Sequence, residues 1–216
     1  MANPAPTTAT NPVLLTGTAS DINVSSQMLE PVADATIKAF KAGVTAPAAM
    51  TTSDAGGAWS LSVASAGAPV NAFVEATKAD HRTVRIYPPQ DLDASLDNIP
   101  TLLLANTTFG LLVQFVAMTT QTAGNGTVGL TVLDCANTPI SGATISVKQN
   151  DVELVTADNT FDTSGLGQGG AFLVFDLPPG ETVVSATFNG MTFRAHTIDV
   201  VADTNSTTAV KPGFTN

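Results

Sequence analysis

Basic and aromatic side chains gather in one short segment, Lys78–Tyr87, where they could bind a ligand. The segment holds four of the ten Lys, Arg and His residues of the chain. If it forms a strand, alternation places its odd-numbered residues on one face. Arginine binds a carboxylate through paired hydrogen bonds, and tyrosine offers a flat ring to a glycan. The alternative is an exposed strand face whose cations pair with neighbouring acids. The candidate ligand-binding residues are His81, Arg82, Arg85 and Tyr87.

The sequence shows no pattern that predicts catalysis. His81 and His196 are the only imidazoles, and neither lies near a Gly-x-Ser-x-Gly nucleophile elbow. The Gly-rich segment 165–170 contains no lysine and leads into an expected strand, so a long hairpin explains it better than a phosphate loop. We therefore expect no enzyme activity, no catalytic residues and no cofactor.

Acidic residues gather in two expected loops. The EF-hand spacing is missing from both, so we predict solvated loops and no metal site, although Ca²⁺ binding to oxygen-rich loops is the alternative. The first cluster is Asp91, Asp93, Asp97 and Asn98, and the second is Asp158, Asn159 and Asp162.

The charge and cysteine content restrict the partners of the chain. Its formal net charge is −10 at pH 7, which opposes binding to nucleic acid or to an anionic membrane surface. The single cysteine, Cys135, excludes an intrachain disulfide, and we expect an inert thiol. No apolar run approaches the ~20 residues that span a bilayer. The Pro/Thr/Asn-rich start is typical of the tether behind a removed export signal, so we expect an extracellular or cell-surface location.

The same pattern occurs twice along the chain. Residues 31–40 (PVADATIKAF) return as residues 139–148 (PISGATISVK), and each copy is followed by a Gly-rich turn that ends in an aromatic residue, Trp59 or Phe172. A repeat of this length predicts two similar folding units in tandem.

Short alternating runs bounded by turn residues predict the fold class, which is all-β with two tandem Ig-like β-sandwiches joined by one short helix. We predict a flexible or extended arm over residues 1–12, a first sandwich over 13–104, a helix and linker over 105–125, and a second sandwich over 126–216. Residues 91–100 are expected to be a loop. Phe109, Leu112, Phe115 and Val116 recur at helical spacing, and we expect this stripe to pack on a sandwich or, alternatively, to bind a partner.

The repeated segments resemble the carboxypeptidase regulatory-like family, of the transthyretin (prealbumin-like) sandwich type. The family pattern Pro-Val-x-Gly-Ala-x-Val is matched by residues 139–145 and, with Asp34 in place of Gly, by residues 31–37. The turn before Trp59 and the Leu-Pro-Pro-Gly run ending at Gly180 also fit. The resemblance implies non-catalytic modules on secreted or surface-anchored proteins. Related sandwiches include intradiol dioxygenases, whose two Tyr ligands this chain lacks, because Tyr87 is its only tyrosine.

Two functional hypotheses follow from the sequence. The first is a non-enzymatic pair of modules that binds a protein or glycan surface, or that spaces another domain. The second is a structural subunit of an extracellular filament, in which residues 1–12 add a strand to the sheet edge of another copy. Relatives locked by Lys–Asn isopeptide bonds are a further alternative, for which Lys38, Lys148, Asn205 and Asn216 offer side chains of the right type.

Overall fold

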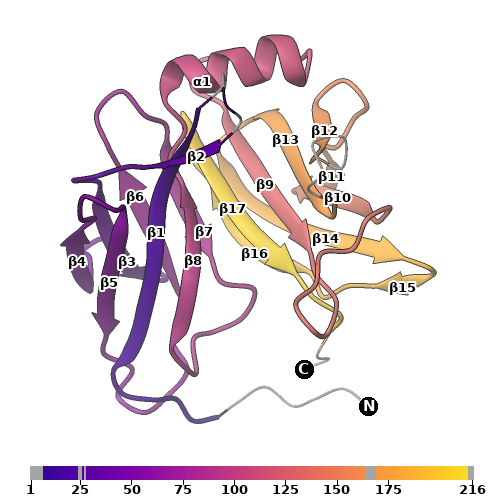
Figure 1. Cartoon of the computed structure of the whole chain (residues 1–216). Coiled ribbons are helices and arrows are strands. Elements are labelled where there is room, and N and C mark those ends of the chain that lie inside the picture. Colours follow the sequence, from indigo (N-terminus) through magenta and orange to yellow (C-terminus); the bar gives the residue numbers. More distant parts are fainter. Residues whose placement is uncertain (1–6, 24–25, 27, 164–168, 214–216) are drawn as a thin grey trace. The chain divides into compact units, whose positions relative to one another are not determined.

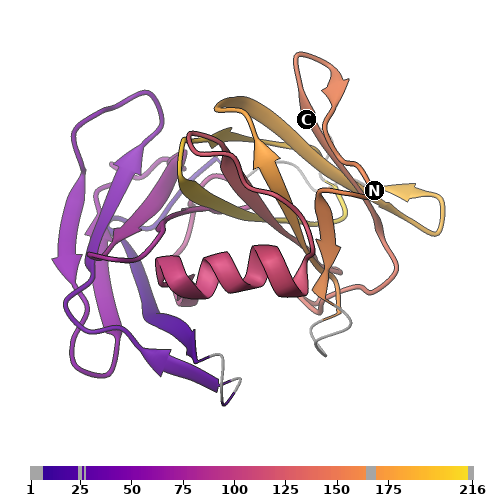
Figure 2. The same cartoon turned by 90° about the horizontal axis from the view of Figure 1, so that it is seen from above.

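A computed structural model of the chain describes residues 7–23, 26, 28–163 and 169–213. The chain divides into two compact units, Pro6–Leu111 and Leu112–Asn216, which are described separately. The all-β class is confirmed. Among the described residues, α-helix is confined to α1 (Asn106–Leu111), which continues directly into the π-helical turn η1 (Leu112–Val116) (Figure 2).

The first unit is a sandwich of two sheets (Figure 1). The central strand of one sheet is β1 (Val13–Asn23). It pairs antiparallel with β2 (Met28–Pro31) and β5 (Ala58–Val63), and parallel with β8 (Leu96–Leu102). The other sheet has the order β7-β6-β3-β4, with β3 (Thr36–Lys41), β4 (Ala49–Thr52), β6 (Ala72–Thr77) and β7 (Thr83–Tyr87).

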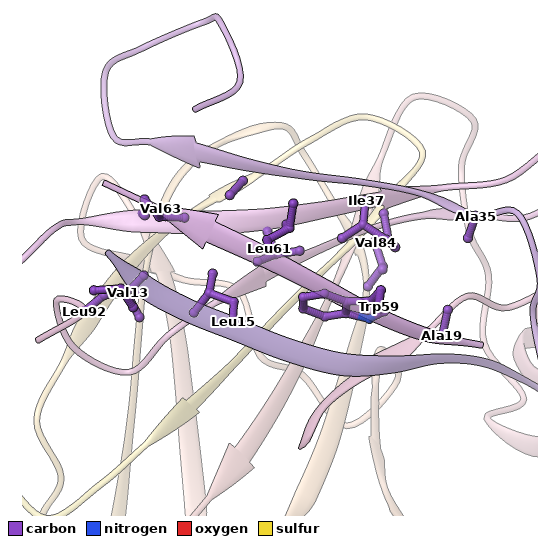
Figure 3. Packing of buried hydrophobic residues seen from close by; sticks show 14 of the residues in the cluster. Val13, Leu15, Ala19, Ala35, Ile37, Trp59, Leu61, Val63, Val84 and Leu92 are labelled. Carbon is purple, nitrogen blue, oxygen red and sulfur yellow. The ribbon is translucent and has the colours of Figure 1, made fainter. Parts of the chain in front are cut away.

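The core of the first unit follows from alternation along these strands. In β5, Trp59, Leu61 and Val63 are buried while the residues between them are exposed. Figure 3 shows Trp59 and Leu61 meeting Ile37 and Val84 between the two sheets. Alternate residues of a strand point to opposite faces, so the inner face of each sheet carries the apolar residues of the core.

The second unit is also a two-sheet sandwich. One sheet is ordered β12-β13-β9-β17, with β9 (Gly126–Val132), β12 (Thr160–Asp162), β13 (Ala171–Leu177) and β17 (Thr204–Val210). In the other sheet β14 pairs with β10, β15 and β16, and β10 pairs with β11; these strands are β10 (Thr144–Gln149), β11 (Val152–Glu153), β14 (Gly180–Phe188), β15 (Met191–Thr192) and β16 (His196–Val200). The turn between β14 and β15 has positive φ at both Asn189 and Gly190, as a two-residue hairpin requires.

Both units share one strand order. The sheet β5-β1-β8 corresponds to β13-β9-β17, and in each the last strand pairs parallel with the first. The sheet β4-β3-β6-β7 corresponds to β11-β10-β14-β16. The repeated sequence therefore coincides with a repeated topology.

The Gly-rich turns make the same backbone hydrogen bonds in both units. Ala19 N donates to Gly57 O (2.8 Å), and Val132 N donates to Gly170 O (2.7 Å). Gly57 and Gly170 have φ of +78° and +81°, and a Cβ on either would collide with backbone atoms, those of Ala19 in β1 at Gly57 and those of Ile140 in the segment before β10 at Gly170. Both constraints require glycine, which explains why the Gly-Gly-Ala-aromatic run recurs.

The replacement of the motif glycine by Asp34 also has a backbone explanation. Gly142 has φ of +77°, and Asp34 adopts φ of +53° at the equivalent position. Aspartate tolerates the left-handed region better than most residues. Ser53 then fixes the turn, because its hydroxyl donates to Val32 O and accepts from Ala35 N.

Three expectations from the sequence need correction. Residues 91–100 are not all loop, because β8 starts at Leu96 and pairs with β1; Asn98, at φ of +58°, lies where the register of this pairing shifts. Phe115 of the helical stripe is 66% exposed, whereas Phe109 is buried. Within the predicted arm, Ala9 N and Thr10 N donate to loop carbonyls of the first unit, so this part of the arm is bound.

Candidate functional site

The outer face of the sheet β7-β6-β3-β4 carries two adjacent rows of side chains. Alternation in β7 directs Val84 to the core and Arg85 and Tyr87 to the opposite face. Pairing of β6 with β3 and β7 brings similar residues together across the three strands. The aromatic row is Phe40, Phe73 and Tyr87, and the ionic row is Lys38, Glu75 and Arg85.

In the aromatic row the three rings stack on one another. The ring centroids of Phe40 and Phe73 are 5.2 Å apart at an interplanar angle of 16°, and those of Phe73 and Tyr87 are 5.1 Å apart at 28°. The middle ring therefore has a neighbouring ring on each side. Phe40 and Phe73 are half-buried, and Tyr87 is 8% exposed.

Arg85 joins the two rows. Its Nε donates to Glu75 Oε2 at 2.9 Å, and its guanidinium carbon lies 4.9 Å from the centroid of the Phe73 ring. Burial by itself lowers the pKa of Arg85, but hydrogen bonds with Tyr87 and Glu75 outweigh it and hold the pKa above its ordinary value. The guanidinium is thus fixed as a cation on this face.

His81 and Arg82, the other two candidate residues, lie apart from these rows, near the start of α1. His81 Nε2 is 3.8 Å from Asp21 Oδ2, and its Nδ1 is 2.8 Å from Ala79 O. The Arg82 guanidinium stacks 4.3 Å from the centroid of the Phe109 ring. The structure therefore brings together Arg85 and Tyr87 of the four candidates, whereas His81 and Arg82 connect the β7 end of the sheet to β1 and α1.

The second unit shows what the fold requires at the equivalent positions. The row that matches Phe40, Phe73 and Tyr87 consists of Lys148, Val183 and Thr197. Lys38 and Glu75 are matched by Ser146 and Ser185. The same strand order thus forms without aromatic or ionic rows, so the fold does not require them. The sequence signal for Phe40 and Phe73, an aromatic residue at an outward position of an alternating strand, was missed because it appears only once both strands are paired.

The acidic clusters do not form a metal site in the described part of the chain. No group of three or more His, Cys, Asp or Glu side chains there is placed to hold an ion. Asp97 Oδ1 accepts a hydrogen bond from Thr16 Oγ1 (2.9 Å), and Asn159 Oδ1 accepts one from Thr156 N (2.9 Å). The Asp97 bond therefore links β8 to β1, and the Asn159 bond is local to its own loop. The Gly-rich segment 165–170 falls mostly outside the described residues.

No helix in the described ranges is both long enough and apolar enough to cross a membrane.

Comparison with known proteins places the chain in no family. No family model matches the sequence, and no curated protein matches it. Among solved structures, the shaft pilin SpaA from Lactobacillus rhamnosus GG is 13% identical, with 97% of this chain and 100% of that chain covered and a TM-score of 0.27. The minor pilin GBS52 of Streptococcus agalactiae is 10% identical over 94% of this chain and 98% of that one, also with a TM-score of 0.27.

The Bacillus anthracis TIE protein is 10% identical, and 92% of this chain and 34% of that chain are covered at a TM-score of 0.30. This chain thus spans about a third of that protein. TM-scores this low carry neither a family nor a function to this chain.

Proposed function

We propose that this chain is a non-enzymatic pair of tandem modules of the carboxypeptidase regulatory-like type that acts outside the cell or at its surface. Its first unit binds a protein or glycan partner that bears carboxylates, through the aromatic and ionic rows of its outer sheet face. The observation that carries the proposal is the difference between the two units. They share one strand order, yet only the first has stacked rings and paired charges at these positions.

The chemistry of this face suits an acidic partner. Lys38 lies opposite Glu75 in the strand register. Within the described residues its side-chain ammonium has no hydrogen bond or ion pair. Two cations and one carboxylate make the ionic row net positive on a chain whose formal charge is −10. The middle ring, Phe73, has both faces covered by the other two, so a partner meets its edge and the cations rather than a flat platform. Ring edges carry partial positive charge, which favours carboxylate oxygens.

The test exchanges two residues of the aromatic row for those of the second unit. The double variant Phe73→Val and Tyr87→Thr installs residues that the same topology already accommodates, and Phe40 is kept because the lysine at its equivalent position would add a cation to this face. We expect the unchanged protein to bind acidic glycans or acidic polypeptides on an array, and the folded double variant to lose at least tenfold in affinity, because aromatic residues contribute strongly to interface energies. Equal binding by both proteins, or no binding by the unchanged protein, would contradict the proposal.

The second candidate function is a filament subunit assembled by strand addition through the N-terminal arm. Ala9 N donates to Gly67 O and Thr10 N to Asp93 O, both at 2.9 Å, so the described part of the arm is bound to loops of the first unit. The observation that favours it is the edge strand β5, which pairs on one side with β1 and has no partner strand on its other side among the described residues. Electron microscopy of the chain with and without residues 1–8 tests this function. Polymers that disappear on truncation support it, and a monodisperse monomer in both samples rules it out.

A further inference from the structure

Strand β5 forms an edge of the first unit that has no partner on its outer side among the described residues. Residue pairs in an antiparallel ladder alternate between hydrogen-bonded and non-hydrogen-bonded. Ala19 N donates to Gly57 O, so the hydrogen-bonded pairs with β1 are those of Trp59, Leu61 and Val63. The N–H and C=O groups of the residues between them point away from β1.

The outward groups at both ends of β5 are already bonded within the unit. Ala58 N donates to Asp54 Oδ1 (2.8 Å), and Asp54 N donates to Ala58 O (2.9 Å). At the other end, Lys41 Nζ donates to Ala64 O at 2.7 Å. The backbone groups of Ser60 and Ser62, two exposed residues, are left between these closed ends.

The corresponding edge of the second unit is covered. Its edge strand β13 pairs antiparallel with β12, which places Phe161 opposite Leu173, and Phe175 N donates to Asn159 O (2.8 Å). Leu173 and Phe175 occupy the positions of Ser60 and Ser62, because Phe172 matches Trp59. The same topology therefore accepts an antiparallel strand at this edge.

Edge strands usually carry charges or prolines that prevent such pairing. The other edge of this sheet follows that rule, since β8 contains Asp97 and Pro100. Strand β5, with the sequence AWSLSV, contains neither. Its edge is also self-complementary, because an acidic residue closes one end and a basic residue closes the other.

We propose that β5 pairs antiparallel with β5 of a second copy of this chain across a twofold axis at Leu61. Ser60 of each copy then faces Ser62 of the other, and their N–H and C=O groups form four hydrogen bonds. The end that holds Asp54 in one copy meets the end that holds Lys41 in the other, so opposite charges face each other at both ends of the contact. Such an isologous contact is closed and gives a dimer rather than a filament. It does not involve the outer sheet face of the first unit.

The test removes one outward donor without touching the pairing with β1. Ser62→Pro deletes an N–H that points away from β1, a position where an edge strand tolerates proline. We expect sedimentation of the unchanged chain to show a dimer and Ser62→Pro to raise the dimer dissociation constant at least tenfold, because two symmetry-related hydrogen bonds are lost. The control Ser62→Ala keeps the N–H and is expected to dimerise like the unchanged chain.

Amide hydrogen exchange of the unchanged chain provides a readout that does not depend on the folding of a variant. We expect the amides of Ser60 and Ser62 to become protected as the protein concentration rises, and the amide of Gly142, an exposed residue of the other unit, to show no such change. A monomer at millimolar concentration, a dimer unaffected by a folded Ser62→Pro variant, or a dimer in which these amides stay unprotected would each overturn the proposal.

Discussion

Gly17 and Trp59 form the tightest contact of the first core. They face each other across β1 and β5, and a Cβ at Gly17 would lie 2.5 Å from Trp59 Cζ2 and still closer to Ile99 O. The indole is also held in place, because its Nε1 donates to Thr101 Oγ1 at 3.1 Å. In the second unit the smaller Phe172 faces Leu130, so one unit combines a large ring with no side chain and the other combines two medium side chains.

Gly17→Ala is therefore expected to destabilise the first unit by about 2 kcal/mol, because overpacking a core in contact with backbone forces a shift of the strand. The change is measured as the urea midpoint of Trp59 fluorescence. Gly110→Ala adds the same methyl group where no atom lies within 4 Å, and serves as the control. If Gly17→Ala leaves the fluorescence midpoint unchanged, the two strands can move apart to accept the methyl group without a loss of stability, and the prediction is wrong.

At the scale of elements, the sequence predicts a strand correctly wherever apolar and polar residues alternate and a turn residue ends the run. Strands β3, β5 and β7 follow from such alternation, and the repeat predicts the two units. Strand β8 was not predicted, because its only strong signals, Asp97 and Pro100, are typical of loops. It forms through parallel pairing with β1.

The sequence predicted only two residues of the candidate site. Arg85 and Tyr87 come from one segment, but the rings beside them come from β3 and β6, and no local pattern joins three strands.

The segment between η1 and β9, expected to be a linker, is instead attached to the second unit. Asp176, at a bulge in β13, accepts hydrogen bonds from Thr122 N (2.7 Å) and Asn125 Nδ2 (2.9 Å). Gln121 Oε1 accepts a further hydrogen bond from Asp176 N (3.0 Å). Burial of the carboxyl raises the pKa of Asp176, but the bonds from Thr122 and Asn125 outweigh it and lower the pKa below its ordinary value.

The lowered pKa fixes the sign of a pH effect. The stabilisation by Asp176 is present above the pKa of the unfolded chain, about 4, and is lost as the pH falls through the lower folded value. At neutral pH, Asp176→Asn should cost on the order of 1 kcal/mol, and the difference from the unchanged chain should shrink at pH 3. Urea midpoints by circular dichroism at both pH values measure it. Asp158→Asn changes the same formal charge and is the control, and a difference that persists at pH 3 would contradict the assignment.

At the scale of the whole molecule, two separate cores predict two unfolding transitions. The first core gathers residues of the first unit only, and the second unit buries its own apolar set, including Val128, Leu130 and Val174. Trp59 is the only tryptophan, so fluorescence reports the first unit alone, whereas circular dichroism reports both. Gly17→Ala should then move the fluorescence transition, and Asp176→Asn should move only the remaining part of the dichroism transition.

Gly17→Ala in the first unit and Asp176→Asn in the second both test whether the two units unfold independently. Domains with their own cores unfold as separate cooperative units unless a large interface couples them. If each variant shifts only the transition of its own unit, the chain behaves as two modules, and the first can acquire a binding face while the second keeps its Ser/Thr-rich one. A single transition, moved equally by both variants and coincident for both probes, would show one cooperative core and refute the modular organisation on which the proposed function rests.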